Sequence, residues 1–128
     1  MTTKAERLQH ANDLIELISN YGRRFFFDQS SGRIAKLEID PRGRIWFVDD
    51  YNGKAIYTHN KNSWRGFSHG GTLRSLIEAL RDYISRDVKL HREYIAPERM
   101  NPGSNIWGYS NETAKILREA AFQMPLFK

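Results

Sequence analysis

The sequence contains no cysteine, which excludes disulfides, thiolate metal ligands and cysteine nucleophiles. Its apolar runs are only a few residues long, so no transmembrane helix is predicted. The N-terminal residues enter a polar helix pattern directly and show no apolar signal segment. We therefore expect a cytoplasmic protein without a membrane partner, made in a bacterial cell and either bacterial or phage-encoded.

Recognisable catalytic motifs are also missing. No segment has the pattern of a nucleophile elbow or a Ser-His-Asp triad, and the GxxxxGK[ST] spacing of a phosphate loop is absent. A metal-dependent nuclease would have to use Asp49, Asp50, His59 or His69. Their spacing matches no ligand motif, and neighbouring strand residues point to opposite faces. The sequence favours a non-enzymatic protein with no metal and no cofactor, and the nuclease is the lesser alternative.

What is present is a basic chain long enough to bury a core. It has 128 residues, of which 40% are apolar and 12% aromatic, and this length suits one domain. Twenty Lys and Arg oppose fifteen Asp and Glu, giving a net charge of +5. Positive charge favours association with nucleic acid or with an acidic protein surface.

The hydrophobic pattern predicts an α+β fold. A capping box of Thr3 and Glu6 opens the first helix, and Thr72 is the expected N-cap of the second. The three helices are expected over residues 4–20, 73–85 and 111–122. The apolar stripe of the second is Leu73, Leu76, Ile77, Leu80 and Ile84. Four strands are expected over residues 23–28, 33–39, 44–50 and 54–59. In the third, the alternation puts Trp46 and Val48 on one face and Ile45 and Phe47 on the other. Consecutive hairpin signals, strongest at Asn52-Gly53, imply a four-stranded antiparallel β-meander packed by about three α-helices. We expect a single α+β domain over 1–122 and a tail over 123–128.

Basic and aromatic residues gather at the strand ends and turns of this meander and in the loop that follows it. They are Arg23, Arg24, Arg33, Arg42, Arg44, Lys61, Trp64 and Arg65. Positive charge follows a nucleic-acid backbone and aromatic faces stack on bases, so one hypothesis is a small module that binds DNA or RNA. The second face of the sheet is then either covered or an aromatic patch containing Trp46. The alternative is that the arginines only protect solvated sheet edges.

A glycine-rich turn precedes the second helix and is a candidate anion contact. Free N–H groups at a helix N-terminus bind anions, and polar side chains lie beside them. The residues are Ser68, His69, Gly70, Gly71 and Thr72. The alternative is a glycine turn that simply starts a helix.

The last residues, Gln123-Met124-Pro125-Leu126-Phe127-Lys128, form an unusual apolar tail. They resemble the short peptide by which bacterial replication and repair proteins dock on the sliding clamp of DNA polymerase III. That peptide is commonly Gln, then Leu or Met, a variable residue and Leu-Phe. The resemblance covers five residues. It implies that Gln123 makes the polar anchor and that Met124, Leu126 and Phe127 fill apolar pockets.

Two features bear on whether this tail is free to dock on a clamp. Pro125 in the variable position restricts the backbone. The tail can also fold back and pack Leu126 and Phe127 against its own domain. Our leading hypothesis is a non-enzymatic protein, with the look of a small phage or mobile-element protein, that docks on the clamp to modulate DNA replication or repair. The alternatives are the nucleic-acid-binding module and an inhibitor of another host defence protein.

Overall fold

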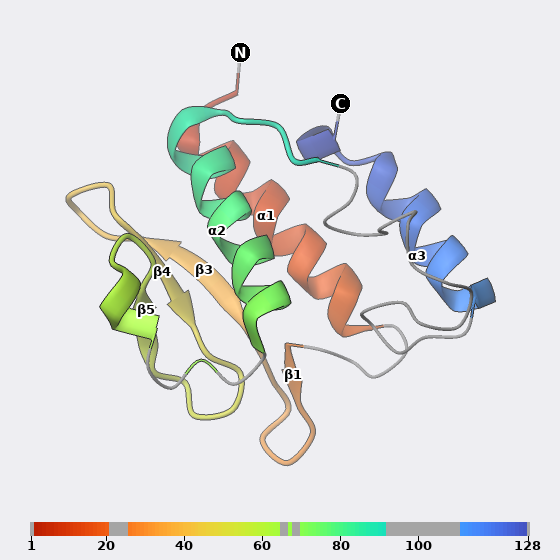
Figure 1. Ribbon diagram of the computed structural model, residues 1–128, viewed down its shortest axis with the longest axis horizontal. Coiled ribbons are helices and arrows are strands. Elements are labelled where there is room, and N and C mark those ends of the chain that lie inside the picture. The colour runs from red at the N-terminus through yellow and green to blue at the C-terminus, as the bar shows by residue number, and fades with distance from the viewer. Residues whose placement is uncertain (1, 21–25, 65–66, 68–69, 92–110, 128) are drawn as a thin grey trace.

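The computed structural model describes residues 2–20, 26–64, 67, 70–91 and 111–127 (Figure 1). It confirms the α+β class. Within these residues the α-helices are α1 (Lys4–Ser19), α2 (Gly70–Arg86) and α3 (Asn111–Phe122). The strands are β1 (Phe27–Asp28), β2 (Arg33–Ile34), β3 (Lys36–Ile39), β4 (Ile45–Val48) and β5 (Ala55–Tyr57). None of the helices described is long and apolar enough to cross a membrane.

Helix α1 is the central element of the fold, because it contacts α2, α3 and β3 (Figure 1). The predicted capping box is present: the Thr3 hydroxyl accepts from the Glu6 N–H at 3.1 Å, and the Glu6 carboxylate accepts from the Thr3 N–H at 3.3 Å. The inward side chains of α1 are fully buried: Ala11, Leu14, Ile15 and Ile18. The apolar residues that recur at helical spacing therefore form the face of α1 that packs in the core.

The sheet differs from the predicted four-stranded meander. Strands β1 and β2 form a separate two-stranded hairpin, and β3, β4 and β5 form a three-stranded antiparallel sheet. The strand predicted over 33–39 breaks at Ala35, whose N–H donates to the Phe26 carbonyl at 2.8 Å. Phe26 is fully buried with a φ of 64°, a backbone conformation outside the β region. Of the strand predicted over 23–28, the described residues show Phe27–Asp28 as β1; residues 23–25 lie outside the described part of the chain.

The three-stranded sheet keeps the predicted alternation. Phe47 pairs with Ile56, and both point to the helices, while Trp46 pairs with Tyr57 on the outer face. The free edge of β3 is closed by Asn12 of α1, which accepts from the Leu37 N–H at 2.7 Å and donates to the Leu37 carbonyl at 3.0 Å. The domain thus satisfies a strand edge with a side chain from its central helix.

Helix α2 packs against both α1 and β4. Its predicted stripe is buried as expected: Leu73, Leu76, Ile77, Leu80 and Ile84. The predicted N-cap is wrong, because the helix starts at Gly70 and Thr72 lies inside its first turn. The glycines extend the helix backwards instead of ending it, since the packing of α2 outweighs their weak intrinsic helix propensity.

Candidate functional site

The outer face of the three-stranded sheet carries an open hollow of about 460 Å³, lined by Arg44, Trp46, Ala55, Tyr57 and Ser63. The Trp46 and Tyr57 ring centroids lie 5.0 Å apart, and the Arg44 guanidinium lies 5.6 Å from the Tyr57 ring centroid. We call Arg44, Trp46 and Tyr57 the aromatic platform. Of the predicted alternatives for this face, the structure shows a partly exposed aromatic patch that contains Trp46.

Asp40 orients the aromatic platform from the turn before β4. Its carboxylate accepts from the Trp46 indole N–H at 2.9 Å and from Arg44 Nε at 2.8 Å. The backbone N–H groups of Arg42 and Arg44 also donate to it, each at 2.9 Å. The Trp46 hydrogen bond is the main reason that the pKa of Asp40 lies far below its ordinary value, with desolvation opposing it. The charged carboxylate thus holds the indole and the guanidinium together at neutral pH.

Sequence reasoning missed this role of Asp40, although a signal existed. An Asp that opens an Asp-Pro-x-Gly turn commonly accepts from backbone N–H groups two residues on. The contacts to Trp46 and Arg44 follow from that turn, because it brings the following strand back past the carboxylate.

His59 extends the aromatic platform toward α2. Its ring centroid lies 5.3 Å from that of Tyr57. Its Nε2 accepts from the Ile45 N–H at 3.1 Å, so the neutral ring carries its proton on Nδ1. Burial, followed by the positive charge of Arg81, lowers the pKa of His59. The ring is therefore neutral at pH 7 and bound to the neighbouring strand.

The other predicted nucleic-acid residues do not gather on the platform. Arg33 donates to the carbonyls of Asp50 and Tyr51 at 3.2 and 3.3 Å, at the opposite end of β4. Trp64 is only 6% exposed, and the Arg74 guanidinium lies 4.9 Å over its ring. Arg42 is exposed in the Asp40 turn beside the platform. The description does not extend to Arg23, Arg24 and Arg65, or to the side chain of Lys61.

The predicted anion contact stays a prediction. Ser68 and His69 lie outside the described residues. The backbone of Gly70, Gly71 and Thr72 forms the first turn of α2.

The two adjacent aspartates belong to the β4–β5 hairpin. Asp49 accepts from the N–H groups of Tyr51 and Asn52 at 2.9 and 3.1 Å, and both Asp49 and Asp50 are buried. Across the described part of the chain, no three His, Cys, Asp or Glu side chains lie close enough to share a metal ion; His69 is outside that part. Asp49 thus supports the turn that Asn52-Gly53 predicted.

The C-terminal peptide is packed against the domain. Pro125–Phe127 form a short 3₁₀ turn, here η3, and the Leu126 side chain is fully buried. The Leu126 carbonyl accepts from the Leu90 N–H at 2.9 Å, and the Pro125 carbonyl accepts from Lys89 Nζ at 3.0 Å. The turn lies beside α1 and α3 (Figure 1). Of the predicted alternatives for the tail, the structure shows the one that folds back.

The remaining tail residues differ in exposure. Gln123 is exposed, whereas Met124 and Phe127 are half-buried. The Phe127 ring meets Phe122 edge to face, with centroids 5.4 Å apart. Docking in an extended conformation would therefore require the turn to open.

Comparisons with known proteins place the chain in one family. The family model described as YoqU matches residues 2–126, which includes most of the tail. The SPbeta prophage-derived uncharacterized protein YoqU of Bacillus subtilis (strain 168) is 33% identical over 119 residues, which cover 91% of this chain and 79% of that protein. No solved structure gives a significant match. The chain belongs to the YoqU family.

Proposed function

We propose that this protein is a non-enzymatic module that binds single-stranded nucleic acid on the outer face of its three-stranded sheet. The observation that carries the proposal is the aromatic platform: Trp46 and Tyr57 side by side, with Arg44 beside them, around an open hollow of about 460 Å³. A base fits against the two rings and a phosphate fits against the guanidinium.

The energetics of such a site follow from its parts. Stacking of a base on an aromatic side chain contributes about 1–3 kcal/mol and tolerates any base, because every base has a π-face. Asp40 already holds the indole and the guanidinium in place, so little side-chain freedom is lost on binding. The net charge of +5 adds attraction to any polynucleotide. We expect weak sequence preference and strong salt dependence.

The family relationship bears on the origin of the protein. The Bacillus subtilis relative is prophage-derived, which supports the expectation of a small phage or mobile-element protein. Such a protein shares its cell with replicating DNA and with transcripts, both of which expose single strands.

The direct test is binding to a short fluorescein-labelled oligothymidylate at low salt, followed by anisotropy. Trp46→Ala is expected to weaken binding at least about tenfold, the lower part of the stacking range. Tyr51→Ala is the matched control, because Tyr51 is an aromatic residue 71% exposed at the hairpin beyond the platform. Failure of the wild-type protein to bind, or equal losses in both variants, would refute the proposal.

Clamp docking by the C-terminal peptide is a second candidate, favoured by the exposure of Gln123 and the partial exposure of Met124 and Phe127. Docking requires Leu126 to leave its buried position. Exposing a leucine costs about 2 kcal/mol, which weakens the apparent affinity roughly thirtyfold.

The clamp experiment is a titration of purified bacterial sliding clamp with the full chain and with Gln123→Ala. This substitution removes the proposed polar anchor without disturbing a buried residue. Binding that the variant loses supports docking, whereas no binding by the wild type at high micromolar concentration excludes it.

A further inference from the structure

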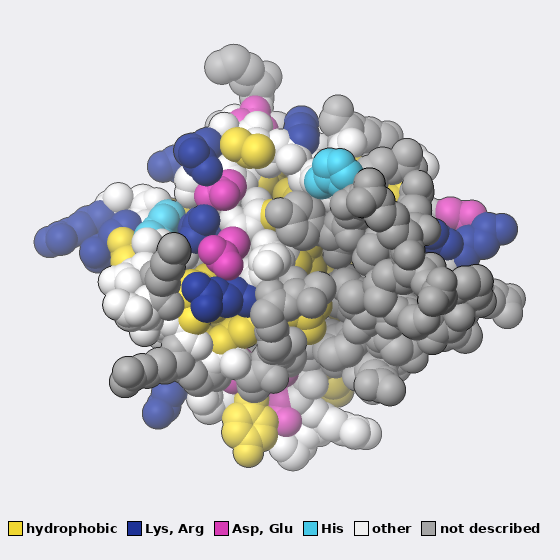
Figure 2. Space-filling model, in the orientation of Figure 1, with side chains coloured by type: hydrophobic (Ala, Val, Ile, Leu, Met, Phe, Trp, Pro, Cys, Tyr) yellow, Lys and Arg dark blue, Asp and Glu magenta, His cyan; other side chains and the backbone are white. Residues whose placement is uncertain are grey.

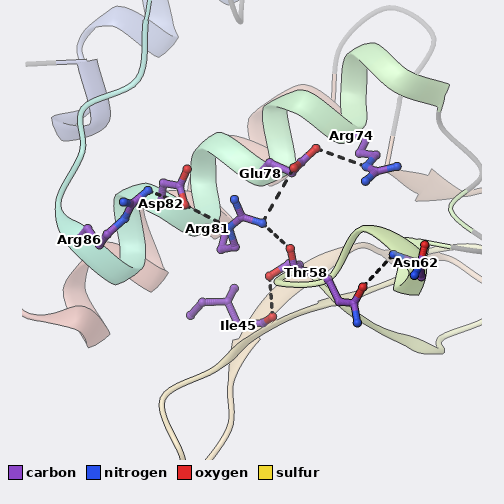
Figure 3. Close-up of polar contacts among 9 residues, drawn as sticks. Ile45, Thr58, Asn62, Arg74, Glu78, Arg81, Asp82 and Arg86 are labelled. Atoms are coloured by element: carbon purple, nitrogen blue, oxygen red, sulfur yellow. Dashed lines mark hydrogen bonds and ion pairs between the residues drawn. The ribbon is translucent and has the colours of Figure 1, made fainter.

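A second hollow lies next to the aromatic platform, between the end of β5, the short helix η1 (Lys61–Trp64) and α2. Its volume is about 200 Å³, and it is lined by Thr58, His59, Asn60, Trp64, Arg74, Glu78 and Arg81. We call it the α2 hollow. Figure 3 shows Arg81 reaching from α2 to Thr58, and Arg74 farther along the same helix beside Glu78. Figure 2 shows basic and acidic side chains alternating on the surface in this part of the molecule.

Two arginines are held in place in the α2 hollow without using all of their donors. Arg74 lies 4.9 Å over the Trp64 ring, and its Nε pairs with Glu78 at 3.3 Å. Arg81 donates through Nη1 to the Thr58 carbonyl and through Nε to Asp82 at 3.1 Å (Figure 3). A guanidinium has five N–H donors, so each arginine keeps donors that these contacts do not occupy.

Neutral donors complete the lining. His59 carries its proton on Nδ1, because Nε2 accepts from a backbone N–H. The Asn60 side-chain oxygen accepts from the Asn62 N–H at 2.9 Å, which orients the amide and leaves its NH₂ group as a donor. The hollow therefore combines positive charge with N–H groups, which is the combination that binds a phosphate oxygen.

The charge of the lining matches one phosphodiester. Arg74 and Arg81 carry two positive charges and Glu78 carries one negative charge, so the net charge of the lining residues is about one unit positive. Asp82 pairs with Arg81 from outside the hollow and is shared with Arg86. A phosphodiester carries one negative charge. The ring of His59 lines this hollow and also contacts Tyr57 of the platform. The ring centroids of the two residues lie 5.3 Å apart, a separation that a single nucleotide can span.

We propose that the α2 hollow is a phosphate subsite for the strand whose base stacks on the aromatic platform. The inference rests on the proposed function and makes it more specific, since it sets the path of the strand: from Trp46 and Tyr57, past His59, to Arg74. The bound nucleic acid then runs from β4 across β5 to α2.

The test compares charge variants on one helix with the same oligothymidylate. Arg74→Gln is expected to weaken binding about fivefold and to reduce the slope of log K against log[salt] by about 0.7, the value for one phosphate on a single strand. Arg86→Gln is the matched control: it removes the same charge from α2, but Arg86 is exposed, pairs with Asp82 and does not line the hollow. Its slope is expected to stay within 0.2 of the wild-type slope, or about a quarter of one contact.

Glu78→Gln provides the reciprocal measurement. Removal of its negative charge is expected to strengthen oligonucleotide binding about twofold to fivefold, whereas a purely structural role of the Arg74–Glu78 pair predicts no gain. This variant also keeps the inference testable if Arg74→Gln does not fold.

The outcomes separate the two proposals. No binding by the wild type would overturn both. Two results would overturn the phosphate subsite and leave the platform intact, provided that Trp46→Ala still weakens binding. One is equal affinity and salt slope for Arg74→Gln and Arg86→Gln. The other is a Glu78→Gln variant that binds no more tightly than the wild type.

Discussion

Truncation of Leu126 to alanine measures how firmly the C-terminal turn is held. The side chain is fully buried and belongs to the main core cluster. Leu→Ala at a buried position costs about 2–5 kcal/mol, the lower values arising where the site can collapse around the gap. Since η3 is a single turn near the surface, we expect a loss of about 2–3 kcal/mol from the free energy of unfolding. That is a large part of the roughly 5–15 kcal/mol available to a domain.

The assay is urea unfolding followed by circular dichroism, with thermal melting alongside. A loss of this size lowers the melting temperature of a chain of this length by about 10 °C. Exchange of the Leu90 amide gives a local reading, because this N–H donates to the Leu126 carbonyl. Its protection is expected to fall in the variant.

Gln123→Ala is the control, because Gln123 is exposed and its loss is expected to change stability by less than about 0.5 kcal/mol. A Leu126→Ala variant as stable as this control would refute the reasoning. It would mean that the tail is not part of the core, and the cost assigned to clamp docking would disappear.

Three further predictions concern other contacts. The pKa of His59 is lowered in the folded protein, so as the pH falls the imidazole is protonated first in the unfolded chain. The free energy of unfolding therefore decreases below about pH 6.5. Urea midpoints measured between pH 7.5 and 5 should show this loss, and His59→Gln should reduce it. Asn12→Ala leaves both backbone groups of Leu37 without their side-chain partner, so the free energy of unfolding should fall by about 1–3 kcal/mol. Sedimentation should also reveal self-association through the opened edge of β3. A monomer of unchanged stability would contradict the capping role. Asp40→Asn should shift Trp46 fluorescence and weaken oligonucleotide binding, because the indole and Arg44 lose their charged acceptor; unchanged affinity would show that platform orientation does not matter.

Much of the architecture follows from local pattern. The Thr3–Glu6 capping box placed the start of α1 correctly, and the predicted end of α3 at residue 122 agrees with its observed end. The alternation along β4 correctly separated the buried Phe47 from the outward Trp46. These features depend on the helix and strand periods and on turn chemistry, all of which act over a few residues.

The errors arise where a distant contact overrides the local pattern. The Ala35 N–H bonds to the Phe26 carbonyl in register with the β1–β2 pairs, whereas Lys36 pairs with Val48 of β4. One predicted strand therefore contributes to two sheets, and no local sequence signal marks that division. Thr72 has the chemistry of an N-cap, but the packing of α2 carries the helix back to Gly70. Propensity is a weak prior, and tertiary packing determines such boundaries.

The sequence by itself therefore determined the α+β class, the three helices, the inward and outward faces of the strands and the basic charge of the chain. Only the tertiary structure decided that the tail is packed, that Asp40 joins Arg44 to Trp46, and that His59 links the platform to the arginines of α2. The physical reason is range: periodicity and capping are properties of neighbouring residues, whereas a site is formed by side chains that chain folding brings together from separate elements.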